Sequence, residues 1–152
     1  MARRRSEQRG GATPAVVRLS EAGVWFTEHH YVHDASATSF GLEAAAELGV
    51  EPARVFKTLV VSAEKGLGVA ILPVDRQLDL KAAGAALGVK KVALADPEAA
   101  QRATGYVVGG ISPLGQRTPS PTVLDGSALA HPTIFVSGGA AASTWNSPPP
   151  TS

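Results

Sequence analysis

Residues 54–74, RVFKTLVVSAEKGLGVAILPV, decide the fold. The stretch holds two apolar, β-branched runs, Arg54–Ser62 and Gly68–Val74, with the polar sequence Glu64-Lys65-Gly66 between them. Runs of this length, separated by a short glycine-containing segment, are typical of a β-hairpin. We therefore predict two adjacent antiparallel strands joined by a turn at residues 64–66.

Shorter segments on both sides of the hairpin extend the predicted fold. Helices are expected where small or apolar residues follow a capping residue and end at glycine. The predicted helices span 13–23, 42–48, 80–87 and 96–104, and the further strands span 24–31, 89–94, 106–108, 122–125 and 133–137. Several strands lie too close together in sequence for helical crossovers. We predict an α+β fold, a single compact domain on a mixed, barrel-like β-sheet flanked by short helices, and not a doubly wound α/β fold.

Composition excludes several classes of protein. The chain has 152 residues, of which 44% are hydrophobic and 18% charged, and it has no cysteine. Such a chain can build the core of one domain, but it cannot form disulfides or thiolate metal sites. No apolar run is long enough to span a bilayer, and no apolar segment follows Arg3–Arg5. A cytoplasmic location without membrane contact is therefore expected.

The charge is distributed unevenly along the chain. Residues 1–13 hold four arginines against one glutamate, whereas the remainder holds 10 basic and 12 acidic residues. We predict a disordered basic arm over 1–12 and a folded domain over 13–139. A body of this charge lacks the broad basic face that DNA binding needs, so no DNA partner is expected.

Lys57 is unusual for a strand residue. It shares a face of its predicted strand with Leu59 and Val61, whereas Phe56 and Val60 belong to the other face, so both faces are largely apolar. A buried ammonium group costs several kcal/mol unless it reaches water or an anion. A functional lysine is one interpretation. A lysine on an edge strand that extends into solvent explains the pattern equally well.

The glycine-rich segment Gly109–Gly115, GGISPLG, is the second unusual feature. Glycines permit a backbone with positive φ and let a ligand approach the amide groups. Such a loop could hold an oxyanion or the sugar-phosphate edge of a nucleotide. By itself the pattern favours an ordinary connection between strands. It is not a phosphate-binding P-loop, because no Gly-Lys-Ser/Thr follows.

Other polar side chains give weaker signals. Histidines and an aspartate gather near the end of one predicted strand, namely His29, His30, His33 and Asp34, and a subset could bind a metal ion. Adjacent histidines on a strand point to opposite faces, so an exposed strand end is the favoured interpretation. No serine has the Gly-x-Ser-x-Gly context of a hydrolase nucleophile.

Several motifs recur in a fixed order along the chain. They are TPAV at 13–16, Tyr31 with His33-Asp34, VFKTL at 55–59, QLDLK at 77–81, ADP at 95–97, TGYVVGGISPLG at 104–115 and VSGG at 136–139. Together they resemble the YbaK family of Cys-tRNA(Pro) deacylases, which is related to the editing domain of bacterial prolyl-tRNA synthetases. The resemblance runs from about residue 13 to residue 139, and the long TGYVVGGISPLG stretch is specific to it.

The resemblance implies a trans-editing hydrolase that frees cysteine from mischarged tRNA(Pro). Lys57 matches the family's essential lysine, which holds the phosphate or sugar of the 3′-terminal nucleotide. The other residues implied in substrate binding are Tyr31, Thr58, Gly109, Gly110, Ile111, Ser112 and Pro113. The implied partners are the acceptor end of mischarged tRNA(Pro) and prolyl-tRNA synthetase, and no cofactor or metal is implied.

The mechanism associated with this family needs no protein nucleophile. The substrate's own thiol attacks its ester carbonyl and forms a cyclic thiolactone, which water then opens. The protein only has to hold the near-attack geometry and stabilise the oxyanion. Three alternatives stay open at this point: a deacylase of Ala-tRNA(Pro), a catalytically impaired module that binds tRNA or synthetase, and a metal-binding protein that uses the histidines.

The end of the chain departs from the family. After Ser-Gly-Gly the family continues with Arg-Gly and a Leu-Asp-containing strand, and this aspartate belongs to its active site. Here Ala140 follows Gly139, and no residue matches the aspartate. Residues 140–152 end in a proline run, so we expect a disordered tail and the loss of a core strand. In GC-rich codons, one extra base before Ala140 restores Arg-Arg-Gly-Leu-Asp-Leu-Glu-Leu, so our hypothesis for the tail is a single-base frameshift.

Overall fold

The computed structural model describes residues 13–15, 17, 21, 27–30, 40–108, 110–140 and 143–147. The strands are β1 (Thr27–His30), β2 (Phe56–Ala63), β3 (Gly66–Pro73), β4 (Val92–Leu94), β5 (Thr122–Leu124), β6 (Ile134–Ala140) and β7 (Ser143–Ser147). The helices are α2 (Phe40–Leu48), α3 (Leu80–Leu87) and α4 (Pro97–Thr104), together with the 3-10 helices η2 (Pro52–Arg54) and η3 (Gly126–Ala130). The predicted basic arm and most of the predicted helix at 13–23 lie outside the described residues.

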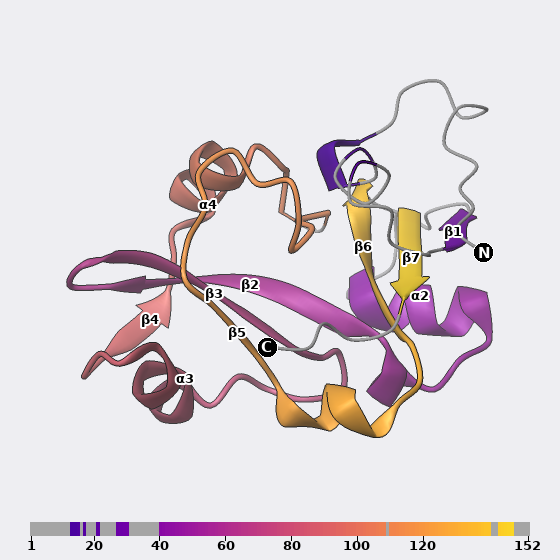
Figure 1. The fold of residues 1–152 in the computed structure, drawn as a ribbon, viewed down its shortest axis with the longest axis horizontal. Helices are drawn as coiled ribbons and strands as arrows, with labels where there is room; N and C mark the ends of the chain where they lie inside the picture. Colours follow the sequence, from indigo (N-terminus) through magenta and orange to yellow (C-terminus); the bar gives the residue numbers. More distant parts are fainter. Residues whose placement is uncertain are drawn as a thin grey trace.

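The predicted hairpin is the centre of a four-stranded sheet with the order β4-β2-β3-β5 (Figure 1). β2 and β3 pair antiparallel along their whole length, from Phe56 opposite Pro73 to Ala63 opposite Gly66. β4 is antiparallel to the end of β2, whereas β5 is parallel to β3. The sheet is therefore mixed, as the sequence predicts.

A second sheet has the order β1-β7-β6 and is antiparallel throughout. The two sheets meet at a parallel bridge between Val55 and Phe135. β6 reaches β2 at this end, while β4 occupies the same edge of β2 at Val61–Ala63, near the other end. Within the described chain the sheets stay open, which corrects the barrel-like part of the prediction. The α+β class itself is confirmed.

The end of the chain also differs from the expectation. Ser143–Ser147 pairs with both β6 and β1, so β7 is the middle strand of the second sheet and not part of a disordered tail. The hydrogen bonds between strands join backbone N–H and C=O groups, and every residue except proline carries both. A strand can therefore form here without the side chains of the family's ending. The proline run at 148–150 lies outside the described residues.

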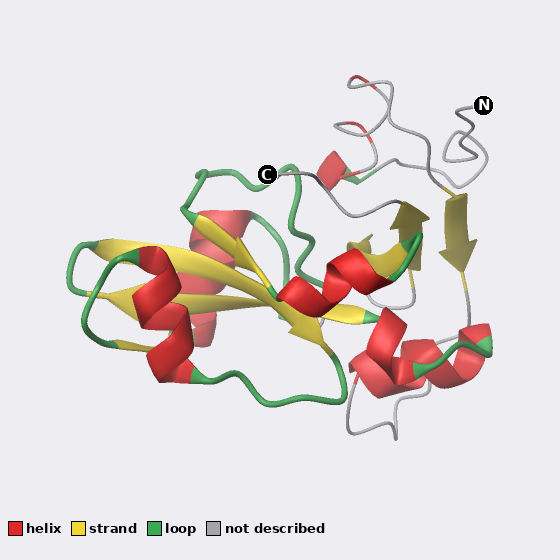
Figure 2. Ribbon diagram, turned by 60° about the horizontal axis from the view of Figure 1, so that its bottom comes forward, coloured by secondary structure: helices red, strands yellow, loops and turns green. Residues whose placement is uncertain are grey.

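Helices α3 and α4 have the boundaries that their capping residues predict. Asp79 and Asp96 accept hydrogen bonds from amides of the first turn, and Gly88 and Gly105 end the helices with positive φ. The two helices lie on opposite sides of the four-stranded sheet (Figure 2).

The predicted strand at 106–108 is wrong. Tyr106 is buried, but the segment after it forms a turn, in which the Gly110 amide donates to the Val107 carbonyl. The Val108 amide donates instead to the side chain of Gln101 in α4, at 3.0 Å. A helix side chain thus takes the place of a neighbouring strand, which three residues of sequence cannot reveal.

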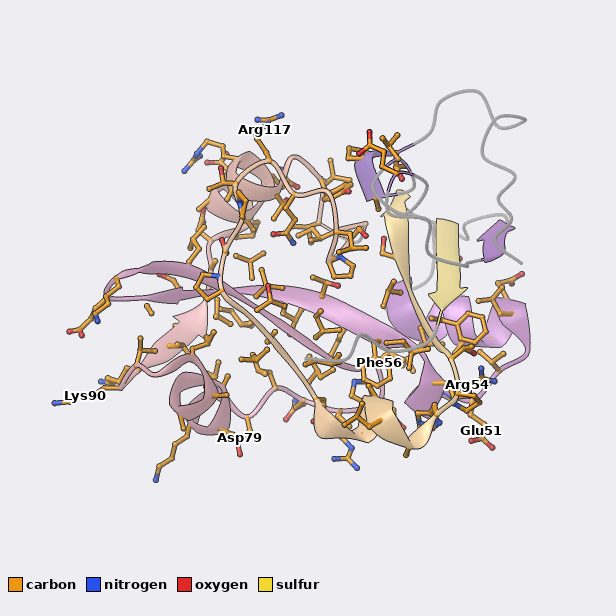
Figure 3. The ribbon with its side chains drawn as sticks, in the orientation of Figure 1. Glu51, Arg54, Phe56, Asp79, Lys90 and Arg117 are labelled. Atoms are coloured by element: carbon orange, nitrogen blue, oxygen red, sulfur yellow. The ribbon has the colours of Figure 1, made fainter. Side chains whose placement is uncertain are left out.

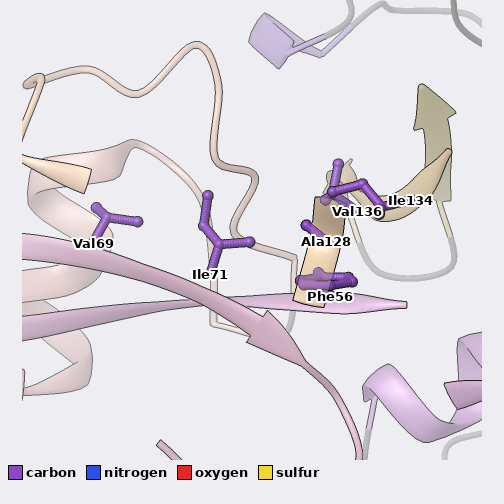
Figure 4. Close-up of a cluster of buried hydrophobic side chains, with 6 residues drawn as sticks. All are labelled: Phe56, Val69, Ile71, Ala128, Ile134 and Val136. Atoms are coloured by element: carbon purple, nitrogen blue, oxygen red, sulfur yellow. The ribbon is translucent and has the colours of Figure 1, made fainter. Parts of the chain in front are cut away.

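The two faces of the central hairpin pack against different elements. One, here called the Thr58 face, consists of Phe56, Thr58, Val60, Val69 and Ile71. Its side chains meet β6 through Ile134 and Val136 (Figure 4) and meet the 106–111 segment and α4 through Tyr106, Ile111 and Ala100. The other, the Lys57 face, consists of Lys57, Leu59, Val61, Gly68, Ala70 and Leu72. Helix α3 approaches this face at Gly68, where an added Cβ would lie 3.0 Å from Leu87 Cδ1.

Candidate functional site

Lys57 and Thr58 leave β2 on opposite faces, because successive strand residues alternate. The burial along β2 follows this alternation: Phe56, Thr58 and Val60 are buried, whereas Lys57 and Leu59 are partly exposed. The structure therefore does not gather the two residues on one surface. A substrate that contacts both side chains has to lie across an edge of β2.

The Lys57 side chain is only partly exposed to water. Surface lysines such as Lys90 extend freely outward (Figure 3), whereas Lys57 is half-buried on an inner strand. Burial lowers the pKa of Lys57, and the negative charge of Asp75 opposes this shift. The edge-strand interpretation is wrong, because β2 lies between β4 and β3, although the Lys57 side chain still reaches solvent. Lys57 is thus a cation with incomplete hydration, and binding an anion would compensate for the missing water.

Thr58 carries a buried hydroxyl group without a hydrogen bond. Its side chain is 8% exposed, and its Oγ1 has no partner among the described residues. A buried hydroxyl without a partner costs about 1–3 kcal/mol. Valine has the same shape and would avoid this cost, so an unpaired threonine here points to a hydrogen bond made with a bound molecule.

The backbone of Thr58 faces a gap in the ladder of β2. Val55 O accepts from the Val74 amide, and Val60 O accepts from the Ala95 amide on the opposite edge of β2. Along a strand, the amide and carbonyl groups of successive residues point to alternate edges. Thr58 therefore presents its amide and carbonyl to the same edge as Val60. Along that edge β4 pairs with residues 61–63 and β6 touches Val55, so no described strand pairs with Thr58 there. Thr58 therefore combines a side-chain hydroxyl without a hydrogen bond and backbone groups that no described strand pairs on this edge.

The glycine-rich loop approaches this site from the Thr58 face. Ile111 is buried in the same cluster as Val60, and Ser112 is fully buried. The Ser112 carbonyl accepts from the side chain of Gln116 at 3.0 Å. The loop is therefore an ordered element, not an ordinary wide connection. Gly110, Ile111, Ser112 and Pro113 are in its described part, whereas Gly109 and Tyr31 lie outside the described residues.

Tyr106 is a buried polar residue that the sequence analysis did not select. Its phenol donates to the Leu114 carbonyl at 2.6 Å. Burial raises the pKa of Tyr106 to about 12, although the Ala15 backbone and the Ser112 side chain act in the opposite direction. The phenol therefore stays protonated at neutral pH. The only sequence signal was its place between Thr104-Gly105 and the glycine-rich loop.

Two further findings concern other classes of function. In the described ranges, no three histidine, cysteine, aspartate or glutamate side chains gather as a metal site would require. His33, Asp34 and the side chains of His29 and His30 lie outside those ranges, so the histidine hypothesis is not tested. None of the helices in the described part of the chain is both long enough and apolar enough to cross a bilayer.

The fold and this site define a known class of protein. The sequence model of the aminoacyl-tRNA editing domain matches residues 34–148, which include β2, the 110–115 loop and β7. The chain therefore belongs to the aminoacyl-tRNA editing domain family, as its motifs predict. The match also includes the strand in the atypical end of the chain.

Individual relatives agree with this assignment. EbsC of Enterococcus faecalis, named as a Cys-tRNA(Pro)/Cys-tRNA(Cys) deacylase, is 36% identical over 141 residues, which cover 91% of this chain and 83% of EbsC. The proline–tRNA ligase of Acidithiobacillus ferrooxidans is 34% identical over 103 residues, covering 68% of this chain but 18% of the ligase. The chain therefore corresponds to one part of that enzyme.

Solved structures share the fold. A protein described as a trans-editing enzyme for prolyl-tRNA synthetase superposes with a TM-score of 0.72 at 28% identity, covering 90% of this chain and 88% of that one. The hypothetical protein APE2540 superposes with a TM-score of 0.79 at 26% identity, covering 89% of each chain. These two structures therefore share the overall fold of this chain.

Proposed function

We propose that this chain is an aminoacyl-tRNA deacylase that hydrolyses Cys-tRNA(Pro) in trans. The observation that carries the proposal is the unpaired hydroxyl of Thr58 at an open edge of β2, beside the ordered 110–115 loop of an editing domain. The similarity to EbsC supports cysteine as the amino acid and tRNA(Pro) as one of its carriers.

The positions of Lys57 and Thr58 suggest how the substrate binds. The half-buried Lys57 ammonium would hold the phosphate or sugar of the 3′-terminal nucleotide, because an anion would replace the interactions with water that the ammonium loses on burial. The aminoacyl group would then cross the open edge of β2 to the Thr58 face. There it would meet the Thr58 hydroxyl and the backbone of Gly110–Pro113, which orients the ester.

The chemistry itself would come from the substrate. Its thiol sulfur bonds to the ester carbonyl carbon, the bond to the ribose oxygen breaks, and the thiol proton passes to that oxygen. This releases free tRNA and a thiolactone, and one water molecule then opens the thiolactone to cysteine. The chain has no cysteine and no Gly-x-Ser-x-Gly nucleophile, which is compatible with this scheme. Ala-tRNA(Pro) has no thiol, so it would be cleaved by a different route or not at all.

The partner and the compartment follow from the same substrate. Outside residues 1–13 the chain has 10 basic and 12 acidic residues, so it should bind tRNA weakly by itself. We propose that prolyl-tRNA synthetase presents the mischarged tRNA, and that the reaction takes place in the cytoplasm, where tRNA is aminoacylated.

The Thr58 hydroxyl can be tested by removing it at constant shape. We expect Thr58→Val to lower kcat/KM for Cys-tRNA(Pro) about 10-fold, the worth of one hydrogen bond, and to raise the free energy of unfolding by about 1 kcal/mol. Thr58→Ser keeps the hydroxyl and should stay active while losing stability. Deacylation time courses and urea denaturation measure both effects. A valine variant with undiminished kcat/KM would show that the substrate does not use this hydroxyl.

The frameshift hypothesis can be tested on the gene and on the protein. Restoring the frame puts the family's aspartate at position 144, and the backbone of Thr144 pairs with Ser137 in the ladder of β6 and β7. We expect Thr144→Asp, or the restored ending, to raise kcat about 10-fold or more if that carboxylate acts on the substrate. A coding sequence without the family ending one base away would refute the frameshift. Equal kcat with and without the aspartate would refute its catalytic role here.

A further inference from the structure

We propose that Tyr106 is the positioning residue that sets the geometry of the 110–115 loop by fastening it to residues 13–15 and to the end of β6 at residues 138–139. The inference rests on the proposed function, because it assigns this loop to substrate positioning. Tyr106 itself packs against Val60 and Ile111 in the core, is 4% exposed and has no free polar atom for a substrate. It therefore acts through the loop and not on the reacting atoms.

The first connection joins Tyr106 to the loop itself. The phenol donates to the Leu114 carbonyl at 2.6 Å. The amide of the same residue donates to the buried Ser112 hydroxyl at 3.4 Å. Tyr106 thus holds Leu114 directly and Ser112 through Leu114, and its rigid aromatic side chain has few internal rotations to lose.

The second connection joins the loop to residues 14–15. Ala15 is fully buried in the same cluster as Tyr106. Gly115, at the end of the loop, has a φ of +70°, and a Cβ added there would lie 2.6 Å from the carbonyl carbon of Pro14. The loop therefore packs directly on the backbone at residues 14–15, and Tyr106 packs with Ala15 while its phenol bonds to the loop.

The third connection reaches the end of β6. A Cβ added to Gly139 would lie 2.7 Å from the Tyr106 ring and 2.9 Å from Thr13 Cβ. The Thr13 hydroxyl donates to the Gly138 carbonyl, and the Gly139 amide donates to the Ser137 hydroxyl at 3.1 Å. Thr13 and Gly139 thus lie beside the ring that holds the loop. Removing the phenol hydroxyl leaves the Leu114 carbonyl without this partner, and we expect the loop to adjust its backbone.

The test compares Tyr106→Phe with Leu87→Ala. The phenylalanine variant keeps the ring and loses only the hydroxyl, while Leu87→Ala destabilises α3 on the opposite side of the sheet. At a temperature where both variants are fully folded, we expect kcat for Cys-tRNA(Pro) to fall about 10-fold in Tyr106→Phe with KM unchanged, and to stay at the wild-type value in Leu87→Ala. Amide exchange of residues 110–115 should accelerate about 10-fold in Tyr106→Phe alone.

The two measurements separate this inference from the proposed function. If the wild-type chain does not deacylate Cys-tRNA(Pro), the proposed function is wrong, but amide exchange still shows whether Tyr106 fastens the loop. If the wild-type chain is active and Tyr106→Phe keeps its kcat and its exchange rates, the positioning role is refuted. Equal kcat losses in both variants would assign the effect of Tyr106 to general stability and would also refute it.

Discussion

Replacing Lys57 by methionine is expected to lower kcat/KM for Cys-tRNA(Pro) about 100-fold, while making the protein more stable at neutral pH. A hydrogen bond between charged groups is worth about 1.5–3 kcal/mol, and its loss from the complex accounts for this factor. Methionine keeps the long side chain but has no charge, so the packing on the Lys57 face is preserved. Activity and stability should therefore change in opposite directions, unlike in a variant that merely unfolds.

The gain in stability that we expect for Lys57→Met becomes smaller as the pH rises. Burial lowers the pKa of Lys57, so the folded protein binds this proton less tightly than the unfolded chain does. The charged lysine therefore costs stability at all pH values below its folded-state pKa, and the cost fades as the pH rises toward the ordinary lysine pKa. We expect the difference in unfolding free energy between Lys57→Met and the wild type to shrink over that range.

Urea denaturation and initial deacylation rates measure both effects. Lys65→Met, at the exposed turn of the hairpin, is the matched control and should change neither quantity. A Lys57→Met variant with the activity of the wild type would remove Lys57 from the site. One that loses stability at neutral pH would contradict the interpretation of Lys57 as a poorly hydrated cation.

Gly115→Ala is expected to lower the free energy of unfolding by about 3 kcal/mol or more. A non-glycine residue at a φ of +70° costs about 1–2 kcal/mol, and the new Cβ would lie 2.6 Å from backbone atoms of Pro14, which cannot turn aside as a side chain can. The contact between the loop and residues 14–15 must then open. The melting temperature should fall by roughly 6–12 °C.

Gly88→Ala is the control for this prediction. Gly88 has a similar φ of +78°, but no atom lies within 4 Å of its added Cβ, so its substitution should show the backbone cost alone. Denaturation of both variants in urea gives the comparison. Equal losses at the two positions would show that the loop does not pack on Pro14 as the structure has it.

Local patterns in the sequence were sufficient for the hairpin and the capped helices. β2 keeps its register because the face of Phe56, Thr58 and Val60 is buried, and a shift by one residue would expose that face. Asp79 and Asp96 are reliable signals of helix starts because their side chains bond to amides only two or three residues away. The family motifs also predicted the editing-domain assignment correctly.

Local patterns failed where a hydrogen-bond partner outside the segment decides its structure. The valines after Tyr106 favour a strand by composition, but the amide of Val108 donates to the side chain of Gln101 in the preceding helix. The end of the chain lacks the composition of a strand, yet β6 and β1 both supply ladder partners to residues 143–147. In both cases these hydrogen bonds outweigh a weak intrinsic preference.

The sequence by itself determined the family, the central hairpin, and the presence of one unusual lysine and one glycine-rich loop. Only the tertiary structure decided how these features relate. It put Lys57 and Thr58 on opposite faces of one strand, left the Thr58 edge without a strand partner in the described part of the chain, and placed Tyr106 between the loop and residues 13–15 and 138–139. The physical reason is that spacing along a chain fixes only nearest-neighbour geometry, whereas an open edge or a buried hydroxyl without a partner depends on which remote segments arrive there.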